Sequence, residues 1–371
     1  MLANGQFVIQ LMEQLAPKHY ALPDDPIGLQ LGTLNKTVSN VLVALDVTAD
    51  VVDEAIERGV QLIVAHHAIM FRPMKHIRTD LPAGRLIERL IKHDIAVYIS
   101  HTNLDVAEGG VNDILAEALG LQELSALQDV HTEKLYKLVV FVPEEHHQRV
   151  QQAVFAAGAG QIGNYGSCSF NVEGTGTFTP MAGSDPYIGQ QGRFEQVKEI
   201  RLETIVPESV RRKTVQAMLK AHPYEEVAYD IYPVDLKGRS FGIGRVGKLG
   251  GETTLTELAE HVKRSYDLTH VRMVGDPNRR IRKVAVLGGA GRSFVQSARF
   301  AGADVLVTGD IDHHTAHDAL ADGMAIIDAG HHIEKLLKPA VAAWLNERLA
   351  TAGYTTAAAA SQVSTDPFRL V

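Results

Sequence analysis

The stretch Leu62-Ile63-Val64-Ala65-His66-His67 places two adjacent histidines directly after a short run of apolar residues. Such a run, rich in Leu, Ile and Val, is typical of a buried strand. In open α/β sheets, functional groups collect beyond the carboxyl ends of the strands. We therefore expect both imidazoles to lie at one edge of a sheet.

Three more apolar runs end in the same way. Each is followed within a few residues by a histidine, a carboxylate or both, and two of the runs lie late in the chain. They are residues 96–99 before Ser100-His101-Thr102-Asn103-Leu104-Asp105, residues 304–307 before Thr308-Gly309-Asp310 and His313-His314, and residues 325–328 before His331 and Glu334. A single site assembled from both ends of the chain is the simplest account.

Composition sets limits on the class of protein. At 371 residues the chain can form two or three packed domains. Its formal net charge of -8 argues against a broad nucleic-acid or anionic-membrane surface. The single cysteine, Cys168, excludes an intramolecular disulfide and a thiolate-cage zinc site. Residues 1–18 lack the basic start that is typical of a secretory signal and carry Glu13 within their apolar pattern, and no apolar run approaches the roughly 20 residues that span a bilayer, so we expect a cytoplasmic protein.

The order of predicted elements indicates an α/β fold with an insertion. Residues 1–127 and 236–371 both alternate between strand and helix patterns, and we interpret them as two halves of one α/β metal-binding domain. Residues 128–235 differ. There Val142-Pro143-Glu144 recurs as Val206-Pro207-Glu208, and each copy predicts a strand, a helix and a strand. Two such copies in tandem favour a ferredoxin-like α+β module.

The two copies have the following predicted bounds. The first comprises a strand at 138–142, a helix at 148–156 and a strand at 164–170, and the second comprises 200–206, 210–220 and 227–232. Between them, residues 174–192 are rich in Gly and Pro and are too long for an ordinary turn. We expect this segment to be a flap or an interface loop.

Imidazoles and carboxylates gathered at strand ends are suitable ligands for a first-row metal ion. The five residues that we select as metal ligands are His66, His67, Asp105, His331 and Glu334. Five ligands exceed what one tetrahedral zinc ion needs, whereas two divalent ions that share a carboxylate would use them all. We expect zinc, with iron, manganese and nickel as alternatives. Taken singly, each residue also has a structural interpretation, such as helix capping by Glu334.

Further groups could serve a reaction at such a site. His101, Asp310 and His314 are candidates for orienting the ligating imidazoles or for transferring protons. Arg72 and Arg292 are candidates for binding a negatively charged substrate, although for each the sequence favours a solvated charge beside a helix. Arg292 lies in Gly288-Gly289-Ala290-Gly291-Arg292-Ser293, which precedes a predicted helix and could receive an anion or form a tight turn without a ligand.

Together these residues resemble the signature of the Ngg-interacting-factor-three-like proteins, also known as GTP cyclohydrolase 1 type 2 homologues. The stretches that carry the resemblance are Ala65-His66-His67, Ser100 to Asp105, Thr308-Gly309-Asp310, and Asp328-Ala329-Gly330-His331-His332-Ile333-Glu334. The resemblance covers nearly the whole chain. Residues 174–180 and 221–226 are similar to the extra domain of the longer bacterial members, which is itself similar to PII signalling proteins.

The resemblance implies a dinuclear metal site on the five residues selected above. It also implies a ring-shaped homo-hexamer whose metal sites face an internal cavity. The chain departs from the family pattern in the loop Asp24-Asp25-Pro26-Ile27-Gly28, where the family usually has Trp-Asp-Asn-x-Gly. Because Pro26 removes an amide side chain and a backbone N–H, a substrate contact from this loop is in doubt.

Two hypotheses of different classes follow. The first is a dimetal hydrolase acting on a nucleotide or a related small substrate, in which metal-activated water attacks C8 of the GTP imidazole ring and formate leaves. The second is a non-catalytic metal-binding assembly or regulatory protein that senses a small ligand or partner through the inserted PII-like module. DNA binding through a ring cavity is a third, which the net charge disfavours.

Overall fold

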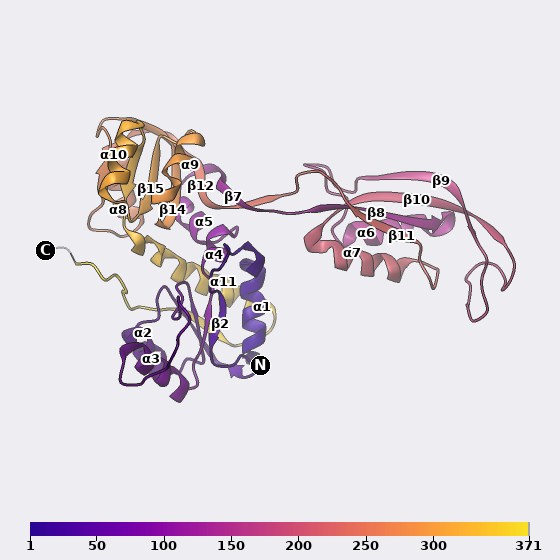
Figure 1. The fold of residues 1–371 in the computed structure, drawn as a ribbon, viewed down its shortest axis with the longest axis horizontal. Coiled ribbons are helices and arrows are strands. Elements are labelled where there is room, and N and C mark those ends of the chain that lie inside the picture. The colour runs from indigo at the N-terminus through magenta and orange to yellow at the C-terminus, as the bar shows by residue number, and fades with distance from the viewer. Residues whose placement is uncertain (370–371) are drawn as a thin grey trace. The chain divides into compact units, whose positions relative to one another are not determined.

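The computed structural model describes residues 1–369, which form two compact units (Figure 1). The first unit combines Met1–His131 with the chain from Phe241 onward, and the second is Thr132–Ser240. The first unit is therefore built from two separated stretches of sequence, and the second lies between them in the chain. Within the described residues, no helix is both long enough and apolar enough to cross a membrane.

The first sheet of the larger unit carries the opening histidine pair. Its strand order is β17-β4-β5-β6-β2, with the first four strands parallel and β2 antiparallel at the edge. The strands are β2 (Gly28–Leu31), β4 (Asn40–Ala44), β5 (Leu62–Ala65), β6 (Ala96–Ile99) and β17 (Ala357–Ala360).

Alternate residues of these strands serve two separate cores. Leu42, Ile63 and Val97 pack with helices α2 (Ala49–Glu57) and α3 (Pro82–Lys92). Their neighbours Val43 and Val64 belong instead to the core that contains residues of α1 (Gly5–Leu15) and α11 (Leu337–Thr351). Because both faces are covered, the central strands are apolar throughout, as expected for a parallel sheet.

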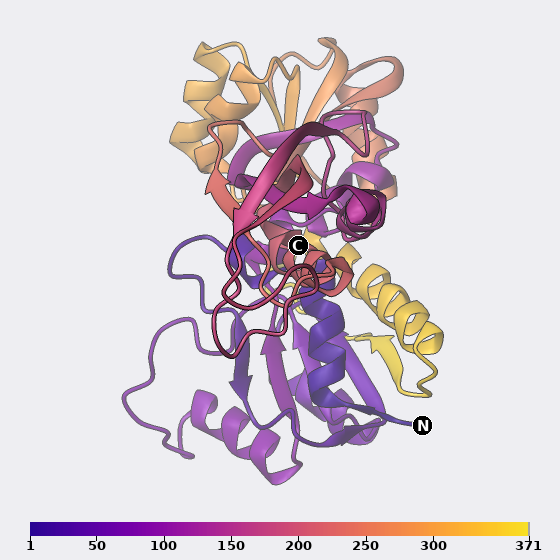
Figure 2. The same ribbon diagram turned by 90° about the vertical axis from the view of Figure 1, so that its right-hand side faces the viewer.

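Pairing of β17 with β4 joins the two ends of the chain. Ala358 lies opposite Val41 in parallel register, and the yellow C-terminal strand is seen beside the violet strands in Figure 2. The hydroxyl of Thr356 accepts a hydrogen bond from the Ala3 backbone N–H and donates one to the Val38 carbonyl. The late part of the chain is thus fixed against the early part.

The second sheet of the larger unit has the order β13-β16-β15-β14-β12-β7, and β14, β15 and β16 are parallel. Its strands are β7 (Gln122–Thr132), β12 (Ser240–Thr254), β13 (Arg272–Val274), β14 (Arg280–Ala290), β15 (Val305–Gly309) and β16 (Ala325–Asp328). The remaining elements of this unit are β1 (Ala3–Asn4), η1 (Lys18–Tyr20), β3 (Thr37–Val38), α4 (Thr102–Val106), α5 (Val111–Ala118), α8 (Leu255–Ser265), η3 (Arg292–Phe294), α9 (Val295–Phe300), α10 (His313–Ala321) and η4 (His331–Leu336).

The unit Thr132–Ser240 has its own antiparallel sheet of order β11-β8-β10-β9 and its own core. Its elements follow the sequence strand, helix, strand, strand, helix, strand, which is the order of a split βαβ fold. They are β8 (Leu135–Pro143), η2 (Glu144–His146), α6 (His147–Ala156), β9 (Ser169–Phe178), β10 (Glu195–Pro207), α7 (Glu208–Ala221) and β11 (Tyr229–Pro233). The repeated Val-Pro-Glu marks the end of β8 and of β10.

One predicted strand in this unit is misplaced. Residues 164–168 are not part of a strand, because Ile162 and Tyr165 exchange backbone hydrogen bonds in a tight turn and Ser167 has a φ of 55°. The strand runs instead from Ser169 to Phe178, so the first five residues of the predicted loop 174–192 are strand. Glycines at 174 and 176 suggested a loop, whereas pairing with β10 holds them extended.

Candidate metal centre

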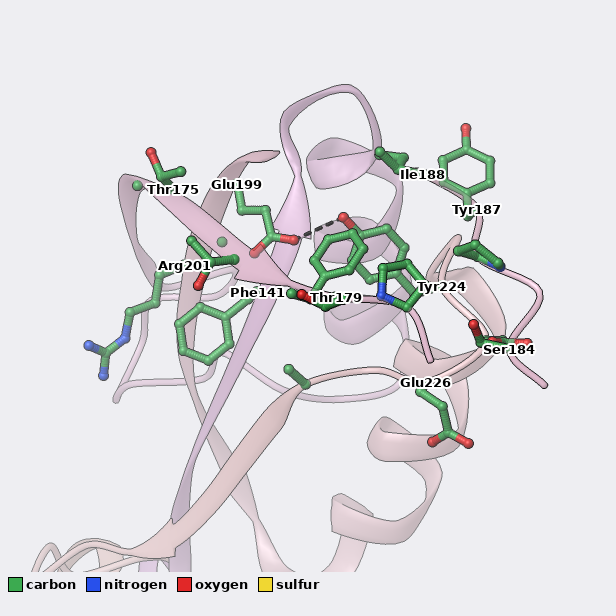
Figure 3. A pocket seen from close by; sticks show the side chains of 18 of the residues that line it. Phe141, Thr175, Thr179, Ser184, Tyr187, Ile188, Glu199, Arg201, Tyr224 and Glu226 are labelled. Atoms are coloured by element: carbon green, nitrogen blue, oxygen red, sulfur yellow. Dashed lines mark hydrogen bonds between the residues drawn. The ribbon is translucent and has the colours of Figure 1, made fainter. Parts of the chain in front are cut away.

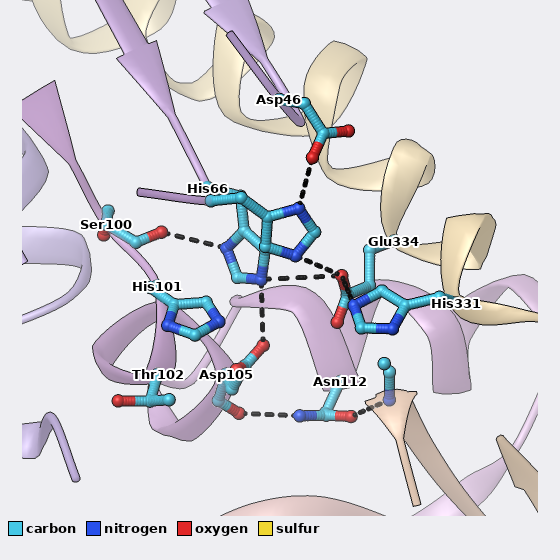
Figure 4. A network of polar contacts seen from close by, with 12 residues as sticks. Asp46, His66, Ser100, His101, Thr102, Asp105, Asn112, His331 and Glu334 are labelled. Atoms are coloured by element: carbon cyan, nitrogen blue, oxygen red, sulfur yellow. Dashed lines mark hydrogen bonds and ion pairs between the residues drawn. The ribbon is translucent and has the colours of Figure 1, made fainter. Parts of the chain in front are cut away.

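The ends of two neighbouring strands and two short helices supply the side chains of the centre (Figure 4). β5 ends at Ala65, so His66 and His67 follow directly, while β6 ends at Ile99 and leads into α4, which begins after His101 and contains Asp105. The late residues His331 and Glu334 lie in η4, which follows β16. Because a 3-10 helix has three residues per turn, side chains three apart lie on the same face.

His66 is fully buried and is held by the neighbouring strand. Its Nδ1–H donates to the Ser100 carbonyl oxygen at 2.9 Å. Its Nε2 lies 3.6 Å from Oδ1 of Asp105 and 3.8 Å from Oε2 of Glu334. The ring therefore turns its second nitrogen toward two carboxylates.

His67 is held in the same way as His66, except that a carboxylate takes the place of the backbone carbonyl at Nδ1. Its Nδ1–H donates to Oδ1 of Asp46 at 2.7 Å, and its Nε2 lies 3.1 Å from Oε2 of Glu334. The other oxygen of Asp46 accepts a hydrogen bond from the hydroxyl of Thr365 in the C-terminal segment. Asp46 and Thr365 were not selected from the sequence, since neither lies in a histidine-containing motif.

His331 and His101 repeat this pattern from other elements. The Nδ1–H of His331 donates to Oδ2 of Asp310 at 2.7 Å, and its Nε2 lies 3.5 Å from Oε2 of Glu334. The Nδ1–H of His101 donates to Oδ1 of Asp25 at 2.8 Å, and the second oxygen of Asp25 accepts from the Thr102 backbone N–H. The loop with the unusual Pro26 thus supports the centre through Asp25.

The resulting donor set fits divalent metal ions. Among the described residues, Nε2 of His66, Nε2 of His67, Oδ1 of Asp105 and Oε2 of Glu334 are buried without a hydrogen-bond partner. Buried polar atoms without partners are costly, and ligating imidazoles normally donate their other N–H to an oxygen, as all four histidines here do. The free atoms converge on a common space.

Three groups of donors have mutual distances within 4.8 Å. They are His66 with Asp105 and Glu334, His67 with His331 and Glu334, and His66 with His67 and His101. The first two groups share Glu334, so this carboxylate can bridge two ions. The structure brings together all five residues selected as ligands and adds His101, which the sequence had suggested only for a supporting role.

The charges in the centre favour cations. Burial lowers the pKa of His66, but the carboxylates of Asp105 and Glu334 outweigh it and the net shift is upward. Burial likewise opposes the charge on His67, yet the hydrogen bond to Asp46 and the adjacent carboxylate of Glu334 raise its pKa to about 10. Burial also disfavours ionisation of Glu334, but the surrounding histidines hold its pKa well below its usual range. A metal ion would compete with protons for these nitrogen and oxygen atoms, so metal binding is expected to depend on pH.

The glycine-rich segment 288–291 packs against this centre. A Cβ atom added at Gly289 would lie 2.7 Å from Oε1 of Glu334, and one at Gly288 would lie 3.1 Å from the same atom. Gly289 also has a φ of 65°, which glycine adopts without strain. The segment therefore makes room for Glu334. The sequence predicted either an anion site or a tight turn without a ligand here, and neither prediction includes this role.

Asn112 connects the early and late stretches beneath the centre. Its side-chain N–H donates to the Asp105 carbonyl at 2.9 Å, and its Oδ1 accepts from the Gly288 backbone N–H at 2.9 Å. Asn112 is fully buried. In sequence it is one polar residue at the start of a helix, so only the contact across the fold reveals this role.

Three selected residues lie apart from the network. His314 is exposed on α10, and its backbone N–H donates to the helix cap Asp312. Arg72 is exposed between β5 and α3, and Arg292 is exposed on η3. Within residues 1–369, none of the three makes a hydrogen bond or ion pair to the centre. Proximity in sequence to a strand end did not bring these side chains inward, because the loop or helix that follows directs them to solvent. Asp310 does reach the centre, as the partner of His331.

Comparisons with known proteins found a family and relatives that match nearly the whole chain. The model of the Duf34/NIF3 (NGG1p interacting factor 3) family matches residues 3–367. Two relatives are named GTP cyclohydrolase 1 type 2 homolog. The one from Halalkalibacterium halodurans is 52% identical to this chain over 100% of both chains, and the one from Bacillus subtilis is 52% identical over 98% of both chains. A crystal structure of a Bacillus cereus protein related to NIF3 matches all of both chains with 51% identity and a TM-score of 0.94.

Proposed function

The chain belongs to the Duf34/NIF3 (NGG1p interacting factor 3) family, and from this membership and its donor set we propose that it is a dinuclear metal-dependent hydrolase. The observation that carries the proposal is the convergence of four buried, unpartnered donor atoms. His66, His67, Asp105, His331 and Glu334 would hold two divalent ions per chain, with Glu334 shared. Zinc is proposed first, and iron, manganese and nickel also accept this ligand set.

Such ions would supply Lewis-acid activation of water and of the oxygen that develops charge. The chain's own groups would orient the ligands and move protons. Asp46, Asp310 and the Ser100 carbonyl fix three imidazoles through Nδ1. His101, held on Asp25, presents Nε2 to the same space and is the proposed proton carrier. Among the described residues, His314, Arg72 and Arg292 make no contact that supports a role in this reaction.

The proposed substrate is a nucleotide or a related small molecule, with hydrolytic ring opening of the GTP-cyclohydrolase type as the reaction. Support comes from the name of the relatives, GTP cyclohydrolase 1 type 2 homolog.

Residues 1–127 and 236–371 would be the halves of the metal-binding domain, and 128–235 would be an inserted PII-like module. The compact units and the β17–β4 pairing support this division. A cytoplasmic homo-hexamer is proposed from the family resemblance.

The first test is metal content by plasma mass spectrometry on protein purified without an affinity metal column. We expect about two first-row ions per chain in the wild type, loss of metal in Asp105→Asn, and full retention in Glu117→Gln, an exposed carboxylate on α5. Formate release from GTP by the metal-loaded protein, absent in Asp105→Asn, would support the reaction. A wild-type protein that retains no metal would overturn the proposal.

A second candidate function is favoured by one observation. The unit Thr132–Ser240 contains a cavity of about 710 Å³, large enough for a small molecule. The protein would then be a regulatory metal-binding protein that senses a ligand through this unit. Full metal occupancy without turnover of any nucleotide or phosphate ester, together with ligand binding in the cavity, would favour this function over hydrolysis.

A further inference from the structure

The cavity of the unit Thr132–Ser240 has aromatic walls (Figure 3). It lies between strands of the sheet, the 179–194 loop and the segment around Tyr224. Four rings line it, from Phe141, Phe178, Tyr187 and Tyr224. The ring centroid of Tyr224 is 6.0 Å from that of Phe178 and 6.4 Å from that of Tyr187. A flat apolar group of a ligand can therefore contact several rings at once.

The loop that closes one side of the cavity is fastened to the rest of the unit. The Tyr187 hydroxyl and Nε2 of His146 are hydrogen-bonded at 2.9 Å, and the Asp185 backbone N–H donates to Oε1 of Glu225 at 2.9 Å. These contacts tie the loop to η2 and to the segment after α7. Because the loop is already held in place, ordering it on ligand binding costs less free energy.

A buried carboxylate with one free oxygen lies in this cavity. Glu199 on β10 is only 9% exposed, and its Oε1 accepts a hydrogen bond from the Tyr224 hydroxyl at 3.0 Å. Its Oε2 has no hydrogen-bond donor among the described residues. That oxygen lies over Gly176, where an added Cβ would approach it to 2.1 Å. This oxygen is not among the buried atoms that lack a partner, so it is accessible from the cavity and can accept a hydrogen bond from a ligand or pair with a cation.

The charged lining residues favour a cation as the missing partner. Among the described residues, the cavity is lined by one base, Arg201, and by four carboxylates, Glu173, Glu199, Glu225 and Glu226. Arg201 is already paired, since its Nη2 lies 2.7 Å from Oε1 of Glu203. A phosphate or carboxylate ligand would meet uncompensated like charge in this cavity. An ammonium group would meet both a carboxylate and the faces of aromatic rings, which attract cations.

We infer that this cavity binds a small organic cation, with an aromatic or apolar body between the rings and a protonated amine at Oε2 of Glu199. This assignment names the ligand class for the second candidate function, and it also stands if the metal centre is catalytic. It excludes a nucleotide as the occupant of the cavity. The cavity and the metal centre share no residue, so their experiments can fail separately.

The test is isothermal titration of the full-length, metal-loaded protein with phenethylamine, and with its neutral and anionic counterparts 2-phenylethanol and 3-phenylpropionate. We expect saturable binding of phenethylamine, at least about tenfold weaker binding of 2-phenylethanol, and none of 3-phenylpropionate. Glu199→Gln should weaken phenethylamine binding by about tenfold or more, because its side chain keeps an acceptor for Tyr224 but loses the charge. Glu145→Gln, an exposed carboxylate of η2 with the same change in charge, should bind as wild type does.

A second variant guards against misfolding of Glu199→Gln. Tyr187 is 54% exposed in the loop, so Tyr187→Ala should fold and should also weaken phenethylamine binding. Equal affinity for phenethylamine and 2-phenylethanol, preference for 3-phenylpropionate or ATP, or no saturable phenethylamine binding would each overturn the inference. Metal content and nucleotide hydrolysis, measured on the same preparations, should be unchanged in both variants.

Discussion

Nε2 of His67 lies 3.1 Å from Oε2 of Glu334, although the two residues come from opposite halves of the chain. The distance suits a metal-bridged pair or an ion pair, and the surrounding atoms distinguish these two roles. Two neighbouring donor atoms, on His66 and Asp105, are likewise buried without a partner. An ion pair alone would leave them unsatisfied, whereas metal ions would use all of them.

Glu334 belongs to two of the donor groups, so its loss should affect both ions. We predict that Glu334→Gln retains little or no metal after desalting, and that Glu117→Gln retains the wild-type amount. Plasma mass spectrometry with parallel circular dichroism would check this. If the folded variant kept both ions, Glu334 would not be a bridging ligand.

The second prediction concerns Asp46, which orients His67 from behind. Asp46→Ala should lower the affinity for metal by about 10–100-fold, the range found for such supporting carboxylates. Thr365→Val should have a smaller effect in the same direction, because it removes only the hydrogen bond to Asp46. Competition with a chromophoric chelator would measure both, with Asp129→Ala on the exposed part of β7 as the control. Unchanged affinity in Asp46→Ala would show that His67 needs no such support.

Gly289 and Gly323 offer a matched pair for testing the glycine-rich segment. Both have positive φ, 65° and 69°, so alanine strains either backbone by about 1–2 kcal/mol. An added Cβ at Gly289 meets Oε1 of Glu334 at 2.7 Å, whereas at Gly323 nothing lies within 4 Å. Gly289→Ala should therefore lose metal affinity as well as stability, and Gly323→Ala should lose stability only. Chelator competition and thermal unfolding separate the two effects, and equal metal affinity in both variants would contradict the proposed role.

His222 should make the unit Thr132–Ser240 less stable in mild acid. Its Nε2–H donates to the Phe141 carbonyl and its Nδ1 accepts from the Tyr224 backbone N–H, so the folded state requires a neutral ring. Burial lowers the pKa of His222 below that of the unfolded chain. The unfolded state therefore binds the proton more readily, and this stability is complete above pH of about 6.5 and is lost as the pH falls toward the folded-state pKa.

Hydrogen exchange of the backbone amides around Phe141 and Tyr224 would follow this loss between neutral and acidic pH. In His222→Asn the exchange rates, corrected for the intrinsic effect of pH on exchange, should be higher at neutral pH. These corrected rates should also change less than those of the wild type as the pH falls. The difference between the two proteins isolates His222 from other titrating groups. Parallel pH dependence in both would exclude His222 as the source.

Much of the candidate site could be predicted because parallel strands bring their carboxyl ends to one edge. His66, His67 and Asp105 follow adjacent strands, and His331 and Glu334 share a face through their spacing. The supporting groups could not be found in this way. Asp46, Thr365 and Asn112 act through contacts between elements distant in sequence, and no local pattern records such contacts.

The sequence by itself determined the apolar strands, the residues that follow them and the chemical class of the site, because burial and periodicity are local properties. Only the tertiary structure decided which strand-end residues face one another. Packing directed His314, Arg72 and Arg292 to solvent, turned Nδ1 of four histidines toward oxygen atoms, and left their Nε2 atoms facing the centre. The physical reason is that a side chain's direction at the end of a strand depends on the loop or helix that follows and on the neighbours it meets there.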